Sequence, residues 1–312
     1  MPQINFLSRL APLVFLIAVS AALAVVRPSF ATSANALTMV QQSAVIIVIA
    51  IGQTILMISG GIDLSVGSVL ALSTIVTAVF HQMGAPPLAG LFAAVLTASL
   101  AGLVNGFVAA KAKIPPFIAT LGMMGMARGL ALILSRAVSL PIPDIYRSMG
   151  SHVSFYAAGV AAVAIGGYLL LTKTIFGRRC YAVGGNKEAA RLSGVDVDRH
   201  LAKTFVLNGF IVGIASVLLM GRLGVVASPT SGEGYELDSI AAAVIGGTSL
   251  FGGHGTVGGS LIGSLIMAVL RNGCDQLNID VNWQIFVIGA MIILAVFYDG
   301  LRRRKSKNLH FR

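Results

Sequence analysis

The chain has 312 residues, of which 56% are hydrophobic and only 11% are charged, and its mean hydropathy is +0.88. Soluble domains carry about 25% charged residues, so this composition excludes an ordinary soluble domain and favours a polytopic membrane protein. The net charge of +11 is spread between hydrophobic segments rather than gathered on one basic domain, which favours an effect of membrane orientation over nucleic-acid binding. With only Cys180 and Cys274, no disulfide framework is predicted.

A helix needs about 20 apolar residues to cross the hydrocarbon core of a membrane. By this measure the sequence predicts an all-α protein with about ten membrane-spanning helices in a single domain, residues 1–312. The predicted spans are residues 10–26, 37–58, 64–80, 88–110, 115–135, 152–172, 203–221, 238–250, 257–276 and 283–298. The first run is long for a signal peptide and is followed by further spans, so we interpret it as a retained helix.

Lys and Arg residues are distributed unequally between the two sets of loops. With both termini cytoplasmic, 16 of these residues lie on the cytoplasmic side and five on the opposite side. Cytoplasmic loops of membrane proteins are rich in Lys and Arg, so this orientation is favoured. The cytoplasmic set is Arg9, Lys111, Lys113, Lys173, Arg178, Arg179, Lys187, Arg191, Arg199, Lys203, Arg302, Arg303, Arg304, Lys305, Lys307 and Arg312, and the opposite set is Arg27, Arg136, Arg147, Arg222 and Arg271.

Charged residues inside the predicted spans are rare. Every acidic residue is assigned near the end of a span, and only Arg128 lies deep within one. For Arg128 we favour structural pairing, for example with Asp144, over snorkelling to the surface or contact with a solute. Carriers coupled to protons or sodium commonly place acids or histidines at mid-membrane, so the energy for transport is expected to come from a partner.

Two glycine-rich segments interrupt the predicted spans, at residues 59–68 and 232–239. In each, an Asp stands where a new helix begins, in the place of an N-cap. The segments are predicted to face opposite sides of the membrane and to occupy matching places in two pseudo-symmetric halves, spans 2–5 and 7–10. Broken helices in matching places of inverted halves indicate a solute pathway. The residues of these breaks are Gly60, Gly61, Asp63, Gly234, Tyr235, Glu236 and Asp238.

Glycines separated by four positions predict close contact between helices, because small residues let two backbones approach where lipid supplies no hydrophobic drive. These pairs are Gly102/Gly106, Gly125/Gly129, Gly209/Gly213, Gly255/Gly259 and Gly259/Gly263.

The longest polar interruption, residues 173–203, carries seven cations and the pattern of a short helix. Asn186 is a candidate N-cap, Glu188 lies in the first turn, Arg191 lies toward the last turn, and Gly194 suits the C′ position. A helix of about two turns is unstable alone in water, so we expect it to rest on a partner protein. An ordinary solvated basic loop is the alternative.

Motifs for nucleotide or metal chemistry are missing from the sequence. No P-loop occurs, and the five histidines are scattered without metal-ligand spacing. The run Gly252–Gly255 is interpreted as a tight turn rather than as a phosphate-binding loop. No cofactor or metal is predicted, and the chain offers no credible nucleophile–base pair, so it is not expected to be an enzyme.

Three blocks of sequence resemble the membrane permeases of bacterial ABC importers for monosaccharides, the ribose-type family. They are SGGIDLSVGSVLALS at 59–73, FGRRCYAVGGNKEAARLSGVDV at 176–197 and GYELDSIAAAVIGGTSLFGGHGT at 234–256, and the similarity extends from Gln41 to Asp299. The resemblance implies a ten-helix permease in the bacterial inner membrane, paired with a second identical or homologous copy. It also implies an ATPase subunit with two fused nucleotide-binding domains, which binds the ATP, and a periplasmic sugar-binding protein.

The resemblance further implies that the loop 173–203 carries the coupling helix that docks on the ATPase. The residues of this helix are Gly185, Asn186, Lys187, Glu188, Ala189, Ala190, Arg191, Leu192, Ser193 and Gly194. Ribose permeases often carry Lys or Arg where this chain has His254, which puts any role of fixed positive charge at that turn in doubt.

A neutral sugar needs hydrogen-bonding groups along an otherwise apolar pathway. The candidates are Gln41, Gln42, Gln53, Asn105 and Asn208, and for each of them hydrogen bonding between helices is the favoured alternative. The same machinery with a nucleoside, inositol or a sugar-derived signal as cargo is an alternative function. A self-sufficient ion-coupled carrier is a second alternative, from a different class.

Overall fold

The computed structural model describes residues 6–309, which leaves Arg312 of the predicted cytoplasmic set outside the described residues. Each predicted span overlaps one helix. These helices are α1 (Phe6–Val26), α2 (Ser33–Ile58), α3 (Val66–Gln82), α4 (Pro87–Ala110), α5 (Pro116–Ser135), α7 (Val153–Lys173), α10 (Val197–Leu223), α11 (Tyr235–Ile245), α12 (Val257–Gln276) and α13 (Val281–Leu309). Shorter elements lie between them: η1 (Pro28–Ala31), α6 (Asp144–Gly150), α8 (Ile175–Gly185) and α9 (Lys187–Leu192).

Six of the helices, α2, α4, α5, α7, α10 and α12, are long and apolar enough to cross a membrane. The chain is therefore an all-helical polytopic membrane protein. Helix α11 has 11 residues, or roughly 17 Å at 1.5 Å per residue, which is too short to cross the hydrocarbon alone. The predicted span 238–250 is thus a half-length helix, and the number of crossings stays a prediction.

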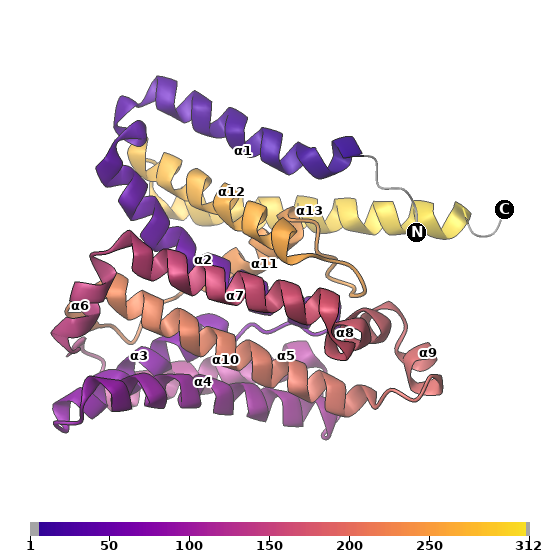
Figure 1. The fold of residues 1–312 in the computed structure, drawn as a ribbon, viewed down its shortest axis with the longest axis horizontal. Coiled ribbons are helices and arrows are strands. Elements are labelled where there is room, and N and C mark those ends of the chain that lie inside the picture. The colour runs from indigo at the N-terminus through magenta and orange to yellow at the C-terminus, as the bar shows by residue number, and fades with distance from the viewer. Residues whose placement is uncertain (1–5, 310–312) are drawn as a thin grey trace.

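One small sheet was not predicted from the sequence. Strand β1 (Leu140–Pro141) pairs antiparallel with β2 (Val226–Ala227), so that Leu140 lies opposite Ala227. The pair joins the segment after α5 to the segment after α10, at the end of the molecule that carries α6 (Figure 1).

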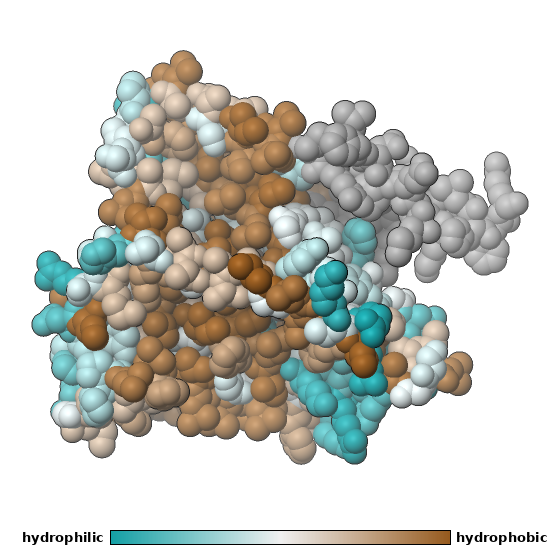
Figure 2. Space-filling model, viewed as in Figure 1, coloured by the Kyte–Doolittle hydropathy of each residue, from teal (hydrophilic) through white to brown (hydrophobic). Residues whose placement is uncertain are grey.

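Helices α2 and α10 form the centre of the bundle. Almost all of α2 from Ser43 onward is buried, and α10 packs against both α2 and α4. The outer helices α4, α5 and α7 expose large apolar side chains, among them Phe107, Phe117 and Ile165. Figure 2 shows a hydrophobic band across the face that carries α7 and α10, with hydrophilic side chains gathered at the two ends of the helices. Such a band is the surface that lipid covers.

Glycines bring α4 and α10 together, as their spacing predicted. A Cβ on Gly102 would lie 2.5 Å from the carbonyl oxygen of Phe205, and a Cβ on Gly213 would lie 2.7 Å from the Cα of Val95. Real Cβ atoms do not approach other atoms so closely, so only glycine fits. Gly125 and Gly129 behave differently, because a Cβ on either residue meets open space among the described residues.

A contact between three backbones lies near α8, and we call it the glycine junction: Ile58, Gly184, Gly252 and Gly253. The amide of Gly253 donates to the carbonyl of Ile58 at 2.9 Å, which joins the end of α2 to the loop between α11 and α12. A Cβ on Gly184, near the end of α8, would collide with the same carbonyl. The predicted tight turn at residues 252–255 is therefore present, and it is packed against α8.

The glycine junction yields a pair of matched variants. We expect Gly184→Ala to destabilise the protein by about 1–3 kcal/mol, because the added methyl forces the three backbones apart. Gly185→Ala is the control, since a Cβ there meets no atom within 4 Å and the residue ends a helix. Thermal unfolding of both variants in detergent measures the effect. Equal unfolding temperatures for the two would contradict the tight contact at Gly184.

Candidate functional site

The short helix predicted within residues 173–203 is present as α9. Asn186 caps it, because its Oδ1 accepts a hydrogen bond from the amide of Ala189 at 3.0 Å. Glu188 in the first turn and Arg191 in the last turn form an ion pair at 2.8 Å. Gly194 follows with a φ of +82°, the left-handed conformation that suits a glycine at C′. The role of this helix in coupling stays a prediction.

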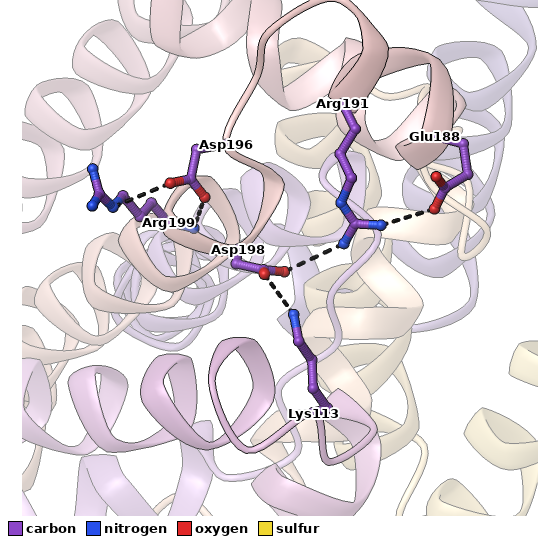
Figure 3. Close-up of polar contacts among 6 residues, drawn as sticks. All are labelled: Lys113, Glu188, Arg191, Asp196, Asp198 and Arg199. Atoms are coloured by element: carbon purple, nitrogen blue, oxygen red, sulfur yellow. Dashed lines mark hydrogen bonds and ion pairs between the residues drawn. The ribbon is translucent and has the colours of Figure 1, made fainter.

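Helix α9 is held to the bundle by few contacts. Ala190 is buried in a small apolar cluster with Val183 and Val197. Arg191 Nη2 lies 3.6 Å from Asp198 Oδ1 in the first turn of α10, and Lys113 pairs with the other oxygen of that carboxylate (Figure 3). The ion pairs are exposed, and each pair of this kind contributes about 0–1 kcal/mol to the stability of the fold. They therefore orient α9 but stabilise it little.

The opposite side of α9 is bare. Leu192 is 90% exposed, and Lys187, Glu188 and Ala189 are exposed beside it. At its other end, α9 reaches the first break, since Lys187 Cε lies 3.6 Å from the position of a Cβ on Gly60. The helix therefore presents one large apolar side chain to its surroundings and contacts the first glycine break with its first residue.

The first break turns directly after α2. Gly60 has a φ of +80°, and the backbone then continues without regular secondary structure to α3. Asp63 is not the N-cap that the sequence analysis predicted. Ser65 precedes α3, and Asp63 Oδ1 accepts hydrogen bonds from the amide of Ser65 at 2.8 Å and from its hydroxyl at 2.6 Å. The carboxylate thus closes a turn two residues before the cap position.

Asp63 is the centre of a buried polar cluster. Its Oδ2 accepts from Asn208 Nδ2 of α10 at 3.0 Å, and Asn105 Nδ2 of α4 donates to the Ser65 hydroxyl at 3.0 Å. All four side chains are buried. The acid does lie near a helix end, as predicted, but that end is inside the protein. The cluster ties the start of α3 to the two helices beside it.

The five candidate solute contacts are divided among different places. Asn105 and Asn208 belong to the Asp63 cluster, whereas Gln41 donates to the carbonyl of Gly150 at 3.0 Å, near α6. Gln42 is half-buried in the first part of α2. Gln53 is fully buried, and neither of its amide atoms has a hydrogen-bond partner among the described residues. The Oδ1 of Asn208 also lacks a partner there.

The second break precedes α11 and is held by two arginines, one from α10 and one from α12. Gly234 occupies the N-cap position, so Asp238, in the first turn, is not the predicted cap. Arg271 Nη2 donates to Asp238 Oδ1 at 2.7 Å, and Arg222 Nη1 donates to the Tyr235 hydroxyl at 2.7 Å. Glu236 accepts from the amide of Gly234 at 3.3 Å.

The predicted pairing of Arg128 with Asp144 is wrong. Arg128 donates instead to the backbone carbonyls of Pro229 and Ser231, in the segment that leads to α11, while Asp144 is exposed at the start of α6. Carbonyls of an irregular segment inside a membrane protein have no partner in a helix or sheet, so they need another donor. The guanidinium of Arg128 is that donor.

The two breaks are predicted to face opposite sides of the membrane. In the structure, the end of the first break lies against the second break in the interior. A Cβ on Gly67, in the first turn of α3, would collide with the carbonyl of Gly232 and with the carboxylate of Glu236. The first break therefore begins at the glycine junction and ends against the second break. The two aspartates at the breaks, Asp63 and Asp238, are buried.

Sequence reasoning missed three important residues. Ser65 lies in the first block without a signal of its own, the charge distribution assigns Arg271 to a loop, and Gly184 falls within the polar loop 173–203. An arginine inside the apolar segment 257–276 indicates that an acid in the interior pairs with it. In the structure that acid is Asp238. No comparable signal marks Gly184, because its neighbours in space come from distant parts of the sequence.

Comparison with known proteins agrees with this architecture. Residues 35–296 match the family described as branched-chain amino acid transport system / permease component. The ribose import permease protein of Bacillus subtilis is 38% identical over 309 residues, which cover 96% of this chain and 94% of that protein. The D-allose transport system permease protein of Escherichia coli is 38% identical, with 87% and 85% of the two chains covered.

The xylose transport system permease protein of Escherichia coli is 32% identical over 89% of this chain and 88% of its own length. No solved structure matches the chain. The match to the family model covers most of the sequence, and the relatives are similar along nearly their whole length. The chain is therefore a permease and not an enzyme, and it belongs to the branched-chain amino acid transport system / permease component family.

Proposed function

We propose that the chain is the inner-membrane permease of a bacterial ABC importer that moves a monosaccharide, driven by ATP hydrolysis in partner ATPase subunits. The observation that carries the proposal is α9, a capped helix that is fixed to the bundle on one side and bare on the other. The names of the relatives, which are permeases for ribose, allose and xylose, support a monosaccharide as cargo. A second permease copy and a periplasmic sugar-binding protein complete the importer.

In this proposal the bare side of α9 docks in a groove of the ATPase. Burying an exposed leucine contributes about 1.5–3 kcal/mol, and a single anchor of that size can dominate an interface. Leu192 is that anchor, and the Glu188–Arg191 pair keeps the helix in shape beside it. Residues 185–194 form the coupling helix, as the resemblance implied.

Force on α9 has a short path into the bundle. Helix α8 leads into α9, and its glycines pack on the last carbonyl of α2 and on the turn before α12. Because these contacts are between backbones, a push on α8 cannot be absorbed by a change of side-chain rotamer. The ends of α2 and α12 are expected to move with α9, and α2 is the most buried helix at the centre.

The packing of the helices supports two inverted halves, α2–α5 and α10–α13. Helix α4 packs on α10, and in the same relation α12 packs on α2. Each half contains a break followed by a shortened helix, α3 or α11, that packs on the next helix along the chain. We place the solute pathway where the two breaks meet, because broken helices of inverted halves leave polar groups at mid-membrane.

Among the buried candidates for solute contact, Gln53 is the one whose two amide atoms both lack a partner among the described residues, so it is the most available to a solute. A buried amide without partners costs about 1–3 kcal/mol, so its hydrogen bonds go to water or to cargo when either is present. Asn105 already has a protein partner, which supports the structural alternative for that residue. An ion-coupled carrier remains the alternative function because two buried acids, Asp63 and Asp238, line the breaks.

The coupling role of α9 predicts the effect of Leu192→Ser and of the double variant Glu188→Ala/Arg191→Ala. We expect both to lower solute-stimulated ATP hydrolysis roughly tenfold or more, since the anchor or its support is lost. Vesicles that hold the permease with its ATPase and binding protein provide the measurement. Met83→Ser is the control, because Met83 is also strongly exposed but follows α3 at the opposite end. Undiminished coupling in Leu192→Ser would overturn the docking role.

Uptake by the purified chain alone separates the two function classes. We expect vesicles that hold only this permease to accumulate no ribose, with or without an ion gradient, and to gain ATP-dependent uptake when the ATPase and binding protein are added. Accumulation driven by a proton or sodium gradient in the absence of ATP would instead identify an ion-coupled carrier.

The proposed pathway predicts opposite effects for two substitutions. Gln53→Leu removes a buried amide without partners, so we expect stability to hold or rise by about 1 kcal/mol while the KM for sugar uptake rises about fivefold. Asn105→Leu removes the donor to Ser65 and should lower stability by about 1–3 kcal/mol. Thermal unfolding and uptake kinetics of both variants test this. A loss of stability in Gln53→Leu with normal uptake would reveal a purely structural glutamine.

Orientation is tested with single cysteines on either side of α4. Gln82→Cys is expected to react with a membrane-impermeant maleimide from outside the cell, and Lys111→Cys only after permeabilisation. Burial raises the pKa of the Cys180 thiol to about 11, so this native cysteine stays protonated and reacts little with maleimide. Cys274 is replaced by serine to remove the other native thiol. Reversed labelling of the two positions would reverse the proposed topology.

A further inference from the structure

A basic pocket of about 450 Å³ lies between α8 and the first turns of α10. Its lining combines three cations, one imidazole, two apolar side chains and one acid. These residues are Arg179, Arg199, Lys203, His200, Ile175, Phe176 and Asp196. On α10 the lining residues recur three and four positions apart, which places them on one face of that helix. The coupling role proposed above does not use this pocket.

The charge of the pocket is unbalanced. Arg179, Arg199 and Lys203 are exposed and carry no acid partner within the lining other than Asp196. Asp196 is already engaged, because it caps α10 through the amide of Arg199 at 3.0 Å and pairs with Arg199 Nε at 3.1 Å (Figure 3). The lining therefore has a formal excess of two positive charges, three cations less one acid, with histidine taken as neutral. Such a concentration of one sign attracts an anion.

The histidine provides an independent indication of a ligand. His200 is only 4% exposed, and its Nε2 has no hydrogen-bond partner among the described residues. The ring is fixed by packing against Phe176, with 4.8 Å between the ring centroids. A buried nitrogen without a partner is costly, and a neutral imidazole protonated at Nε2 donates one hydrogen bond. An oxygen of a bound anion would satisfy it.

The place of the pocket indicates that the anion has an apolar part. Helix α10 continues from the pocket as an apolar span, and α7 ends at Lys173, just before α8. Ile175 is 60% exposed at the pocket. Figure 2 shows that hydrophilic side chains gather at this end of the molecule, beside the hydrophobic band of α7 and α10. The pocket therefore lies at the level where lipid headgroups begin.

We propose that this pocket binds the phosphodiester headgroup of an anionic phospholipid in the cytoplasmic leaflet. The two guanidinium groups donate to the phosphate oxygens, Lys203 adds a positive charge, and His200 donates from Nε2. Ile175 and Phe176 contact the first methylenes of an acyl chain. The leaflet follows from the orientation in the proposed function, whereas the preference for a lipid phosphate follows from the lining alone. A bound lipid links α8 to α10 next to the coupling helix.

The test is lipid binding to the purified full-length permease in detergent, measured by native mass spectrometry and by thermal stabilisation. The probes are phosphatidylglycerol, phosphatidylcholine and inorganic phosphate. We expect phosphatidylglycerol to bind and to stabilise the protein, and the triple variant Arg179→Gln/Arg199→Gln/Lys203→Gln to bind it roughly 100-fold more weakly, since each basic side chain near an anionic lipid contributes about a factor of five. The matched control Lys111→Gln/Lys173→Gln/Arg178→Gln loses three exposed cations from the same end without touching the pocket.

Three results would overturn the site. They are an equal loss of binding in the control variant, equal binding of phosphatidylcholine, and full competition by millimolar inorganic phosphate, which would identify a site for a soluble anion. If the triple variant does not fold, the single variants Arg199→Gln and Lys203→Gln are each expected to weaken binding about fivefold, and unchanged binding in both would refute the proposal. The measurement needs no ATPase, binding protein or sugar, so its failure is distinct from failure of the proposed importer.

Discussion

The structure depends on one close contact, the approach of the α8 backbone to the last carbonyl of α2. Inside a membrane, lipid is as apolar as the side chains, so helices gain little by hiding apolar surface and adhere through van der Waals packing and hydrogen bonds. At the glycine junction the Ile58 carbonyl accepts from Gly253 while Gly184 packs against it. One carbonyl thus joins three segments that are far apart in the sequence. The position of α9 relative to the centre of the bundle follows from this contact.

The need for hydrogen-bond partners inside the membrane also explains the structure of the two breaks. A chain that leaves helical geometry in the interior exposes amides and carbonyls that water cannot reach. The first break is closed by Asp63, which accepts from Ser65 and Asn208. The second is closed by Arg128, which donates to two carbonyls. The carboxylate of Asp63 accepts hydrogen bonds where the first break has donors without partners. The guanidinium of Arg128 donates hydrogen bonds where the second break has carbonyls without partners. Each charge is where it is because of the backbone beside it.

The sequence was sufficient for features that depend on neighbours along the chain. The positions of the long helices follow from apolar length, and the cap at Asn186 with the left-handed Gly194 follows from local hydrogen bonding. Features that depend on distant partners were missed or misplaced. Arg128 was assigned to Asp144 because no pattern in the sequence shows that carbonyls at 229–231 pass beside it. Gln41 and Asn208 likewise lie in different parts of the bundle because they differ in depth, and composition does not encode depth.

The arrangement of the interior acids bears on how transport is driven. A group that relays protons must change its partners during the cycle, yet Asp63 holds the start of α3 to α10, and Asp238 holds α11 to α12. Replacing either acid by a residue without an acceptor would leave its buried donors unpaired, at a cost of about 1–3 kcal/mol for each orphaned group. These acids are therefore better suited to keep two shortened helices rigid than to shuttle an ion. In the proposed importer, rigid halves that meet at Gly67 and Gly232 transmit displacement, and α9 is the surface element through which the ATPase displaces them.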